Sequence, residues 1–590
     1  MALNYRRNEY EIISLYSKKF AGQEVHHMPK TVAIGIQDFA TLIKENYFYI
    51  DKTNFIKEWW EKGASTTLIA RPRRFGKTLN MSMLDYFFSL KHTDKKELFE
   101  NLSIWQEEKY RHIQGTYPVI SLSFANIKDT NFKTVRKKLC QFLANLYGEH
   151  SYLLESEALT ETDIRYFKRV SEEMDDSDAT LALYQLSKFL YQHYGKKVII
   201  LLDEYDTPMQ EAYVGGFWDE LVAFTRSLFN SAFKTNPYLE RAIMTGITRV
   251  SKESIFSDLN HLDVVTTTSQ KYETAFGFTE MEVFTALEEY GMSGEQDAVK
   301  FWYDGFIFGK QKDIYNPWSI INLLDKRDID VYWANTSSNS LVGKLLREGN
   351  SDIKVIFEGL LKGENLKTHI DEQIVYNQLG NNASAVWSLL LASGYLKVVE
   401  CKTMINGLER EKRYELAITN YETRQMFEHM VIDWFSKVDY AYNGFVKAML
   451  TDDKKAMNVY MNKVALHSFS SFDTGNQPSQ LEPERFYHGF VLGLLVELKN
   501  EYVVTSNRES GFGRYDVMIE PKDTATKKAF ILEFKVHDNE DEETLKDTVQ
   551  ADLKQIEDKQ YAAQLEARGI SKEWIRCYGF AFQGKQVLIG

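Results

Sequence analysis

The sequence of 590 residues contains few cysteines, few prolines and no long apolar run. Its three cysteines, Cys140, Cys401 and Cys577, are too far apart to indicate a disulfide framework or a cysteine-rich zinc site, which favours a reducing cytoplasm. No stretch approaches the roughly 18 apolar residues of a membrane span, and the N-terminal residues lack the apolar centre of a signal peptide. We therefore expect a cytoplasmic protein with no membrane segment.

An excess of basic charge is also absent, since the formal net charge is −13. Any nucleic-acid binding would therefore depend on a local basic patch and not on the field of the whole protein. The composition is globular, with 44% hydrophobic and 26% charged residues, so long disorder is not expected. The length exceeds what one hydrophobic core usually organises, which predicts several domains.

Residues 68–84 read LIARPRRFGKTLNMSML and resemble a phosphate-binding loop, G-x-x-x-x-G-K-[ST], whose first glycine is replaced by Arg71. A β-prone run precedes the loop and apolar residues at helical spacing follow it, which predicts the order strand, loop, helix. Such a loop surrounds phosphates with backbone N–H groups, and its Lys and Thr contact phosphate and Mg²⁺. The alternative is a chance GKT at a helix start. The predicted nucleotide-binding residues are Arg73, Arg74, Phe75, Gly76, Lys77 and Thr78.

Two features of this loop stay open. The Cβ of Arg71 narrows the turn around the phosphates, so tight binding without rapid turnover is one expectation. Arg73 and Arg74 could contact phosphates, a neighbouring subunit or an acidic segment of the same chain.

Residues 196–209 read KKVIILLDEYDTPM, where an apolar run typical of a strand buried on both faces ends in two acidic residues. Asp203 is predicted to hold Mg²⁺, and Glu204 to orient or deprotonate the attacking water. A solvated acidic turn is the alternative. The next apolar segment ends at Thr245, predicted to sense the γ-phosphate, and is followed by Arg249, predicted either to stabilise transition-state charge or to form a surface ion pair.

Four segments together resemble the bacterial AAA-ATPase-like family over roughly residues 30–265: IGIQDFATLIKENYFYIDKT, ARPRRFGKT, ILLDEYDTPM and TGITRVSKESIFSDLNHL. The resemblance implies a P-loop ATPase domain that uses ATP and Mg²⁺, and the family tolerates Arg at the position of the first loop glycine. Members of this family often end in a nuclease-like domain.

The middle of the chain carries no catalytic motif. Aromatic-rich turns between residues 301 and 336 are predicted to pack, and the resemblance implies an ATPase lid there. Residues 384–431 predict a helix, a hairpin turning at Asn406 and Gly407, and a second helix, which together indicate a winged-helix element. Such an element binds DNA or serves for packing, and its charged wing, GLEREKRYE, favours packing.

The C-terminal segment predicts a helix and three strands, with Asp516 on the second strand and Glu533 and Lys535 on the third. Residues i and i+2 of a strand share a face, so Glu533 and Lys535 point together and a neighbouring strand can bring Asp516 beside them. Two carboxylates and a lysine predict a site for Mg²⁺ or Mn²⁺ that activates water on a phosphodiester.

This pattern resembles the PD-(D/E)xK nuclease superfamily, with Tyr515 where the motif has proline. The resemblance implies that Gln555 on the following helix reaches the phosphate or the metal-bound water. His488 on the preceding helix is a candidate metal ligand or a packed histidine, and Glu484 and Glu497 are alternative acids of that helix.

We therefore predict an α/β multidomain protein. Its predicted parts are an N-terminal helical extension (1–30), a P-loop AAA-like ATPase domain (31–265), a helical lid (266–370), a winged-helix-like region (371–470) and a restriction-endonuclease-like α/β domain (471–590).

The predicted function is an ATP-binding and ATP-hydrolysing protein whose nucleotide state controls a Mg²⁺- or Mn²⁺-dependent nuclease acting on DNA or RNA. Defence or handling of mobile DNA is the expected setting, by analogy only. The alternatives are a nucleotide-switched scaffold with a silent nuclease-like domain and an ATP-driven remodeller of protein complexes. A homo-oligomer is compatible with each.

Overall fold

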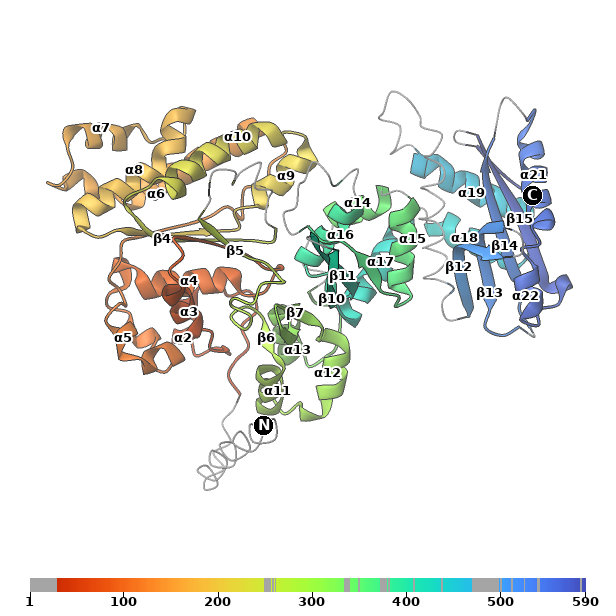
Figure 1. Cartoon of the computed structure of the whole chain (residues 1–590), viewed down its shortest axis with the longest axis horizontal. Helices are drawn as coiled ribbons and strands as arrows, with labels where there is room; N and C mark the ends of the chain where they lie inside the picture. Colours follow the sequence, from red (N-terminus) through yellow and green to blue (C-terminus); the bar gives the residue numbers. More distant parts are fainter. Residues whose placement is uncertain are drawn as a thin grey trace, which may run out of the picture.

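The computed structural model arranges the chain along one long axis, from an N-terminal sheet through a middle region to a C-terminal sheet (Figure 1). It describes residues 29–590 apart from short segments. The segments outside this description are 1–28, 249–255, 257–258, 260, 334–339, 349–350, 372–378, 380–382, 407–408, 437–438, 470–497, 499–500, 511–512, 525, 538–541 and 584–585.

The N-terminal part is built on a five-stranded sheet in the order β2-β3-β4-β1-β5, in which every pairing is parallel. The apolar runs of β1 and β3 are buried along their whole length, as strands covered on both faces must be. The carboxyl ends of β1, β3 and β4 meet at one edge, where sheets of this kind bind ligands. The strands are β1 (Thr66–Ala70), β2 (Val119–Ser123), β3 (Val198–Asp203), β4 (Leu239–Gly246) and β5 (Leu262–Val265).

Helices cover both faces of this sheet, with α2 to α5 on one side and α6, α8 and α10 on the other (Figure 1). The helix α4 begins directly after the loop that follows β1. The helices are α2 (Phe39–Lys44), α3 (Asn54–Lys62), α4 (Lys77–Phe88), α5 (Glu108–Arg111), α6 (Phe132–Glu149), α7 (Glu161–Arg169), α8 (Asp176–Tyr194), α9 (Thr207–Gly215) and α10 (Trp218–Phe229).

The predicted lid has its own small core, formed by three helices and by β6 and β8 of a three-stranded antiparallel sheet in the order β6-β8-β7. Its elements are β6 (Phe278–Thr279), α11 (Glu280–Glu289), α12 (Gln296–Tyr303), β7 (Phe306–Phe308), β8 (Gln311–Tyr315) and α13 (Pro317–Lys326).

The middle region contains a long antiparallel hairpin of β10 and β11 between two helices, with β9 added at the edge of β11. This is the helix, hairpin, helix order that the sequence predicts, while the winged-helix assignment stays a prediction. The elements are α14 (Ser340–Glu348), α15 (Ser351–Leu361), β9 (Leu366–Thr368), α16 (Ala383–Ala392), β10 (Leu396–Asn406), β11 (Glu409–Ile418) and α17 (Tyr421–Ser436).

The C-terminal sheet is mixed, in the order β12-β13-β14-β15-β16, with only the β14–β15 pairing parallel among the described strands. The amides of Asn458 and Asn462 on α19 donate to the carbonyl oxygens of Ile589 and Val587, at 2.9 and 2.7 Å, and fix that helix on β16. The elements are α18 (Asp439–Leu450), α19 (Lys454–Phe469), β12 (Tyr502–Ser510), β13 (Gly513–Pro521), β14 (Ala529–Val536), α21 (Leu545–Asp558), α22 (Ala563–Ala567), β15 (Ile575–Gln583) and β16 (Gln586–Ile589).

A parallel sheet in one part and a mixed sheet in another confirm the predicted α/β multidomain class. Within the described part of the chain, the helices are all too short or too polar to cross a lipid bilayer.

Candidate functional site

The loop between β1 and α4 has the arrangement expected of a phosphate-binding loop. Gly76 adopts φ 78°, a left-handed conformation that glycine enters without steric cost, immediately before α4 begins at Lys77. The Lys77 ammonium is 6% exposed and donates to the carbonyl oxygens of Arg71 and Pro72, at 3.0 and 2.7 Å. Burial lowers the pKa of Lys77, while neighbouring carboxylates, chiefly Glu204 and Asp203, favour its charged form. The lysine is thus folded over its own loop.

Arg71, at the position of the first loop glycine, sends its side chain out of the loop. The side chain is fully buried, and its guanidinium donates to the carbonyl oxygen of Thr266 and, at 3.2 Å, to that of Lys271. The same group lies 4.3 Å from the ring centroid of Phe308. Arg71 therefore anchors the loop to the segment after β5, and only its Cβ remains beside the turn.

The acid at the end of β3 joins the loop to the strand beside it. Thr78 donates to Asp203 Oδ2 at 2.7 Å, and Thr245 at the end of β4 donates to Asp203 Oδ1. Asp203 is 4% exposed, and burial raises its pKa against the effect of these two hydrogen bonds. The structure thus brings Lys77, Thr78, Asp203 and Thr245 to one point. A hydroxyl and a carboxylate are hard oxygen donors that fit Mg²⁺.

The residues after Asp203 shape the same edge. Glu204 has φ 50°, unusual for a residue with a side chain, and its N–H donates to Thr245 Oγ1 at 3.2 Å. Asp206, which the sequence analysis did not select, is 1% exposed and accepts hydrogen bonds from the N–H groups of Ile247 and Thr248, both at 2.9 Å. It holds the segment that follows β4. The acidic run D-E-Y-D was the available signal.

The side chains of the other predicted loop residues point to neighbouring elements. Arg73 donates to Gln210 Oε1 at 3.0 Å, and the guanidinium of Arg74 lies 4.4 Å from the ring of Trp318. Phe75 packs edge-on against Phe306, with ring centroids 4.8 Å apart. These three side chains therefore tie the loop to α9, α13 and β7.

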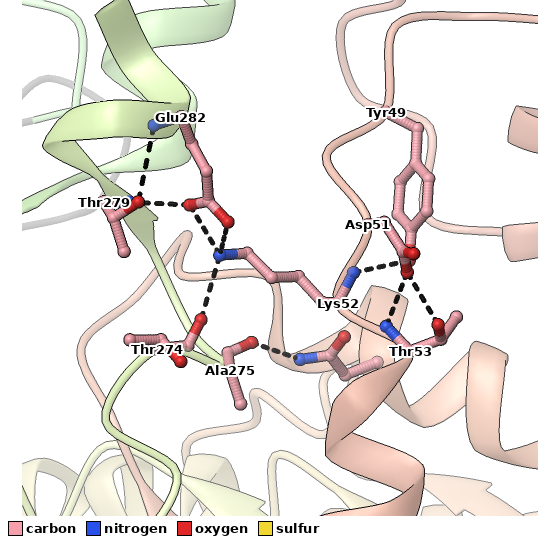
Figure 2. A network of polar contacts seen from close by, with 9 residues as sticks. Tyr49, Asp51, Lys52, Thr53, Thr274, Ala275, Thr279 and Glu282 are labelled. Atoms are coloured by element: carbon pink, nitrogen blue, oxygen red, sulfur yellow. Dashed lines mark hydrogen bonds and ion pairs between the residues drawn. The ribbon is translucent and has the colours of Figure 1, made fainter. Parts of the chain in front are cut away.

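Polar contacts join the predicted lid region to the N-terminal domain, and one of them reaches the loop between β1 and α4. Trp333 donates its indole N–H to the carbonyl oxygen of Arg73 at 3.0 Å. Figure 2 shows a second link, in which the Lys52 ammonium contacts both carboxylate oxygens of Glu282, each at 2.7 Å, and the carbonyl oxygen of Thr274 at 2.9 Å. The aromatic turns that the sequence predicts as packing therefore also hold the phosphate-binding loop.

In the C-terminal sheet, each of the predicted acids Asp516 and Glu533 accepts a hydrogen bond from a backbone N–H of the other's strand. The backbone N–H of Asp516 on β13 donates to Glu533 Oε2 at 3.3 Å, and the N–H of Phe534 on β14 donates to Asp516 Oδ2 at 2.9 Å. Gln555 on α21 donates its amide N–H to Glu533 Oε1. Asp516, Glu533 and Gln555 thus lie together, as the spacing of the motif predicts.

Lys535 shares the face of Glu533 because the two residues are two positions apart on one strand. Its ammonium lies 3.6 Å from Glu542 Oε1, and Glu542 also accepts a hydrogen bond from Thr548. The lysine side chain is 44% exposed, so it can turn towards a bound phosphate.

A further carboxylate, Asp552, lies in this centre and was missed by the sequence analysis. It is 1% exposed, on α21, three residues before Gln555. Burial raises its pKa to about 8, with repulsion from Asp516 adding to the shift and attraction to Lys535 opposing it. Burial and repulsion from Asp516 likewise raise the pKa of Glu533 to about 8. The centre is therefore rich in buried acid, which fits a divalent cation.

Four predicted or alternative site residues lie outside the described part of the chain: Arg249, Glu484, His488 and Glu497. Their assignments remain predictions.

The fold and these two clusters define a chain that joins a P-loop nucleotide-binding domain to a nuclease-like domain, and comparison with known proteins agrees. Residues 33–256 match the family model described as "Predicted AAA-ATPase", and residues 482–590 match "PD-(D/E)XK nuclease superfamily". The chain therefore contains an AAA-ATPase-like domain and a PD-(D/E)XK nuclease superfamily domain, which confirms both resemblances noted in the sequence.

A relative is found in Azotobacter chroococcum mcd 1, where it is described as an uncharacterized protein in the vnfD 5' region. The two sequences are 24% identical over 397 residues, which cover 67% of this chain and 68% of the relative.

Proposed function

We propose that ATP binding by the AAA-ATPase-like domain controls a Mg²⁺- or Mn²⁺-dependent nuclease centre that acts on DNA or RNA. The observation that carries this proposal is the pairing, in one chain, of the Lys77–Thr78–Asp203 cluster with the interlocked carboxylates of Asp516 and Glu533.

At the nucleotide site, Lys77 exchanges the carbonyl oxygens of Arg71 and Pro72 for the β- and γ-phosphates. Thr78 and Asp203 hold Mg²⁺. Glu204 orients the attacking water, and Thr245, which already contacts both Asp203 and the Glu204 N–H, senses the γ-phosphate.

At the nuclease centre, Asp516 and Glu533 would hold a divalent cation, which would supply a water of lowered pKa. Lys535 orients the attacking oxygen or stabilises charge on the phosphate. The water oxygen would form a new P–O bond and release a proton to solvent, the bond to the leaving oxygen would break, and that oxygen would take up a proton from solvent. Gln555 keeps Glu533 oriented through its amide N–H.

Control of one site by the other is supported by a continuous set of contacts. The Glu422 carboxylate, on the first turn of α17, accepts from the N–H groups of Tyr332 and Trp333, at 2.7 and 2.6 Å. Trp333 in turn holds the Arg73 carbonyl oxygen of the loop. The helices α18 and α19 follow α17 and pack on the C-terminal sheet. A movement of the loop on phosphate binding would therefore be transmitted to α17 through Trp333 and Glu422.

The test is to incubate the full chain with supercoiled plasmid, linear DNA, single strands and RNA, in Mg²⁺ or Mn²⁺, with and without ATP. Cleavage that is lost in Glu533→Gln and no longer responds to ATP in Lys77→Ala is the expected result. A chain that binds ATP but cleaves nothing under any of these conditions refutes the nuclease and indicates a nucleotide-switched scaffold.

A further inference from the structure

Asp552 lies beside Gly579, the residue of β15 that pairs with the predicted metal ligand Glu533. In the parallel pairing of β14 and β15, Glu533 is opposite Gly579. A Cβ built on Gly579 would lie 2.8 Å from Asp552 Cβ and 3.5 Å from its Oδ2, so the carboxylate occupies the space that the missing side chain leaves. One turn further along α21, Gln555 bonds to Glu533. The helix thus presents Asp552 and Gln555 to the same point.

The carboxylate of Asp552 is buried without a hydrogen-bond donor from the described side chains. By strict hydrogen-bond geometry neither oxygen has a partner in the described part of the chain, although the backbone N–H of Phe580 is near enough to favour the charged form, and the residue is 1% exposed. A buried carboxylate without donors is costly, so such groups are normally paired or bound to metal. The nearest opposite charge is Lys535, which also faces Glu542.

We propose that Asp552 is a positioning residue of the cation site at Asp516 and Glu533, where it accepts a hydrogen bond from a cation-bound water. The inference rests on the proposed function. We assign an indirect role because the ligand atoms of Asp516, Glu533 and Asp552 do not all lie within 4.8 Å of one another. Among the described residues, only one group of three acids meets that distance, and it lies elsewhere, at Glu280, Asp304 and Asp313. Outer partners of this kind typically change metal affinity about 10- to 100-fold.

The test measures Mn²⁺ binding to the nucleotide-free full chain by calorimetry, in an Asp304→Asn background that removes the competing acid group. Asp552→Asn is compared with Asp558→Asn, which removes one carboxylate from an exposed position of the same helix. We expect Asp552→Asn to weaken Mn²⁺ binding about tenfold or more, whereas Asp558→Asn changes it less than twofold. Asp552→Ser is the second variant if Asp552→Asn does not fold, as judged by circular dichroism.

The control for the site itself is Asp516→Asn. Mn²⁺ binding that depends on Asp516 but is unchanged by both Asp552 variants overturns this inference and leaves the proposed function standing. Absence of any Asp516-dependent Mn²⁺ binding in the parent chain overturns both.

Discussion

Replacing Arg71 by glycine restores the usual phosphate-binding pattern, yet we expect the variant to be less stable and to bind ATP more weakly. The guanidinium is fully buried, donates to two backbone carbonyl oxygens and lies 4.3 Å from the ring of Phe308. Each buried acceptor left unpaired costs about 1–3 kcal/mol, and the lost contact with the ring adds about 1–2 kcal/mol. Release of the desolvation cost of Arg71 offsets part of this, which leaves a net loss of about 3–5 kcal/mol.

For a domain of this size, that loss corresponds to a fall in melting temperature of about 6–20 °C. The assay is thermal unfolding of the full chain, with calorimetric titration of an ATP analogue in Mg²⁺ beside it. Arg71→Lys keeps the charge but offers no planar fork, so its melting temperature is expected between those of the parent and the glycine variant. Unchanged stability together with tighter nucleotide binding in Arg71→Gly would refute the anchoring role.

Three further predictions concern other parts of the chain. Trp333→Phe removes the indole N–H that donates to the Arg73 carbonyl oxygen but keeps an aromatic ring. We expect a smaller effect of ATP on cleavage, with the affinity for ATP changed less than about threefold. An unchanged effect of ATP would argue against coupling of the two sites through Trp333. Burial, with repulsion from Asp313 added, raises the pKa of Asp304 to about 6, so ionisation of Asp304 destabilises the folded state as pH rises from about 4 to 6. In urea unfolding, Asp304→Asn should therefore stabilise the chain by about 1–3 kcal/mol at pH 7.5 and have no effect near pH 4. Equal stabilisation at both pH values would contradict this prediction. Gly579→Ala places a Cβ 2.8 Å from the Cβ of Asp552 and should lower the free energy of unfolding in urea by about 1–3 kcal/mol. Unchanged stability would mean that α21 can shift away from β15 at no cost.

The parallel sheet could be predicted because its signal lies within single strands. The run that forms β3 is apolar up to its final Asp203, which is what burial on both faces requires, and β1 is a β-prone run of two threonines and three apolar residues; both observed strands are buried throughout. Once such strands are recognised, their carboxyl ends must meet. That rule places Asp203 and Thr245 together, and Thr78 joins them because α4 begins directly after the loop that follows β1.

The direction of the Arg71 side chain could not be predicted in the same way. Its partners, Thr266, Lys271 and Phe308, are about two hundred residues away in the sequence, and no local pattern marks a backbone carbonyl as an acceptor. Asp552 carries a weak signal, its spacing of three from Gln555. That spacing gains meaning only from the register that sets Glu533 opposite Gly579.

The two sites differ in how they balance charge before any ligand binds. The Lys77 ammonium lies among the acids of the nucleotide site and offsets them. The nuclease centre gathers Asp516, Glu533 and Asp552 near the partly exposed Lys535, and pKa values of about 8 keep Glu533 and Asp552 largely protonated near pH 7 while no cation is bound. In the proposed function these protons therefore leave as the cation binds, because the carboxylate ligands of a divalent cation must be ionised.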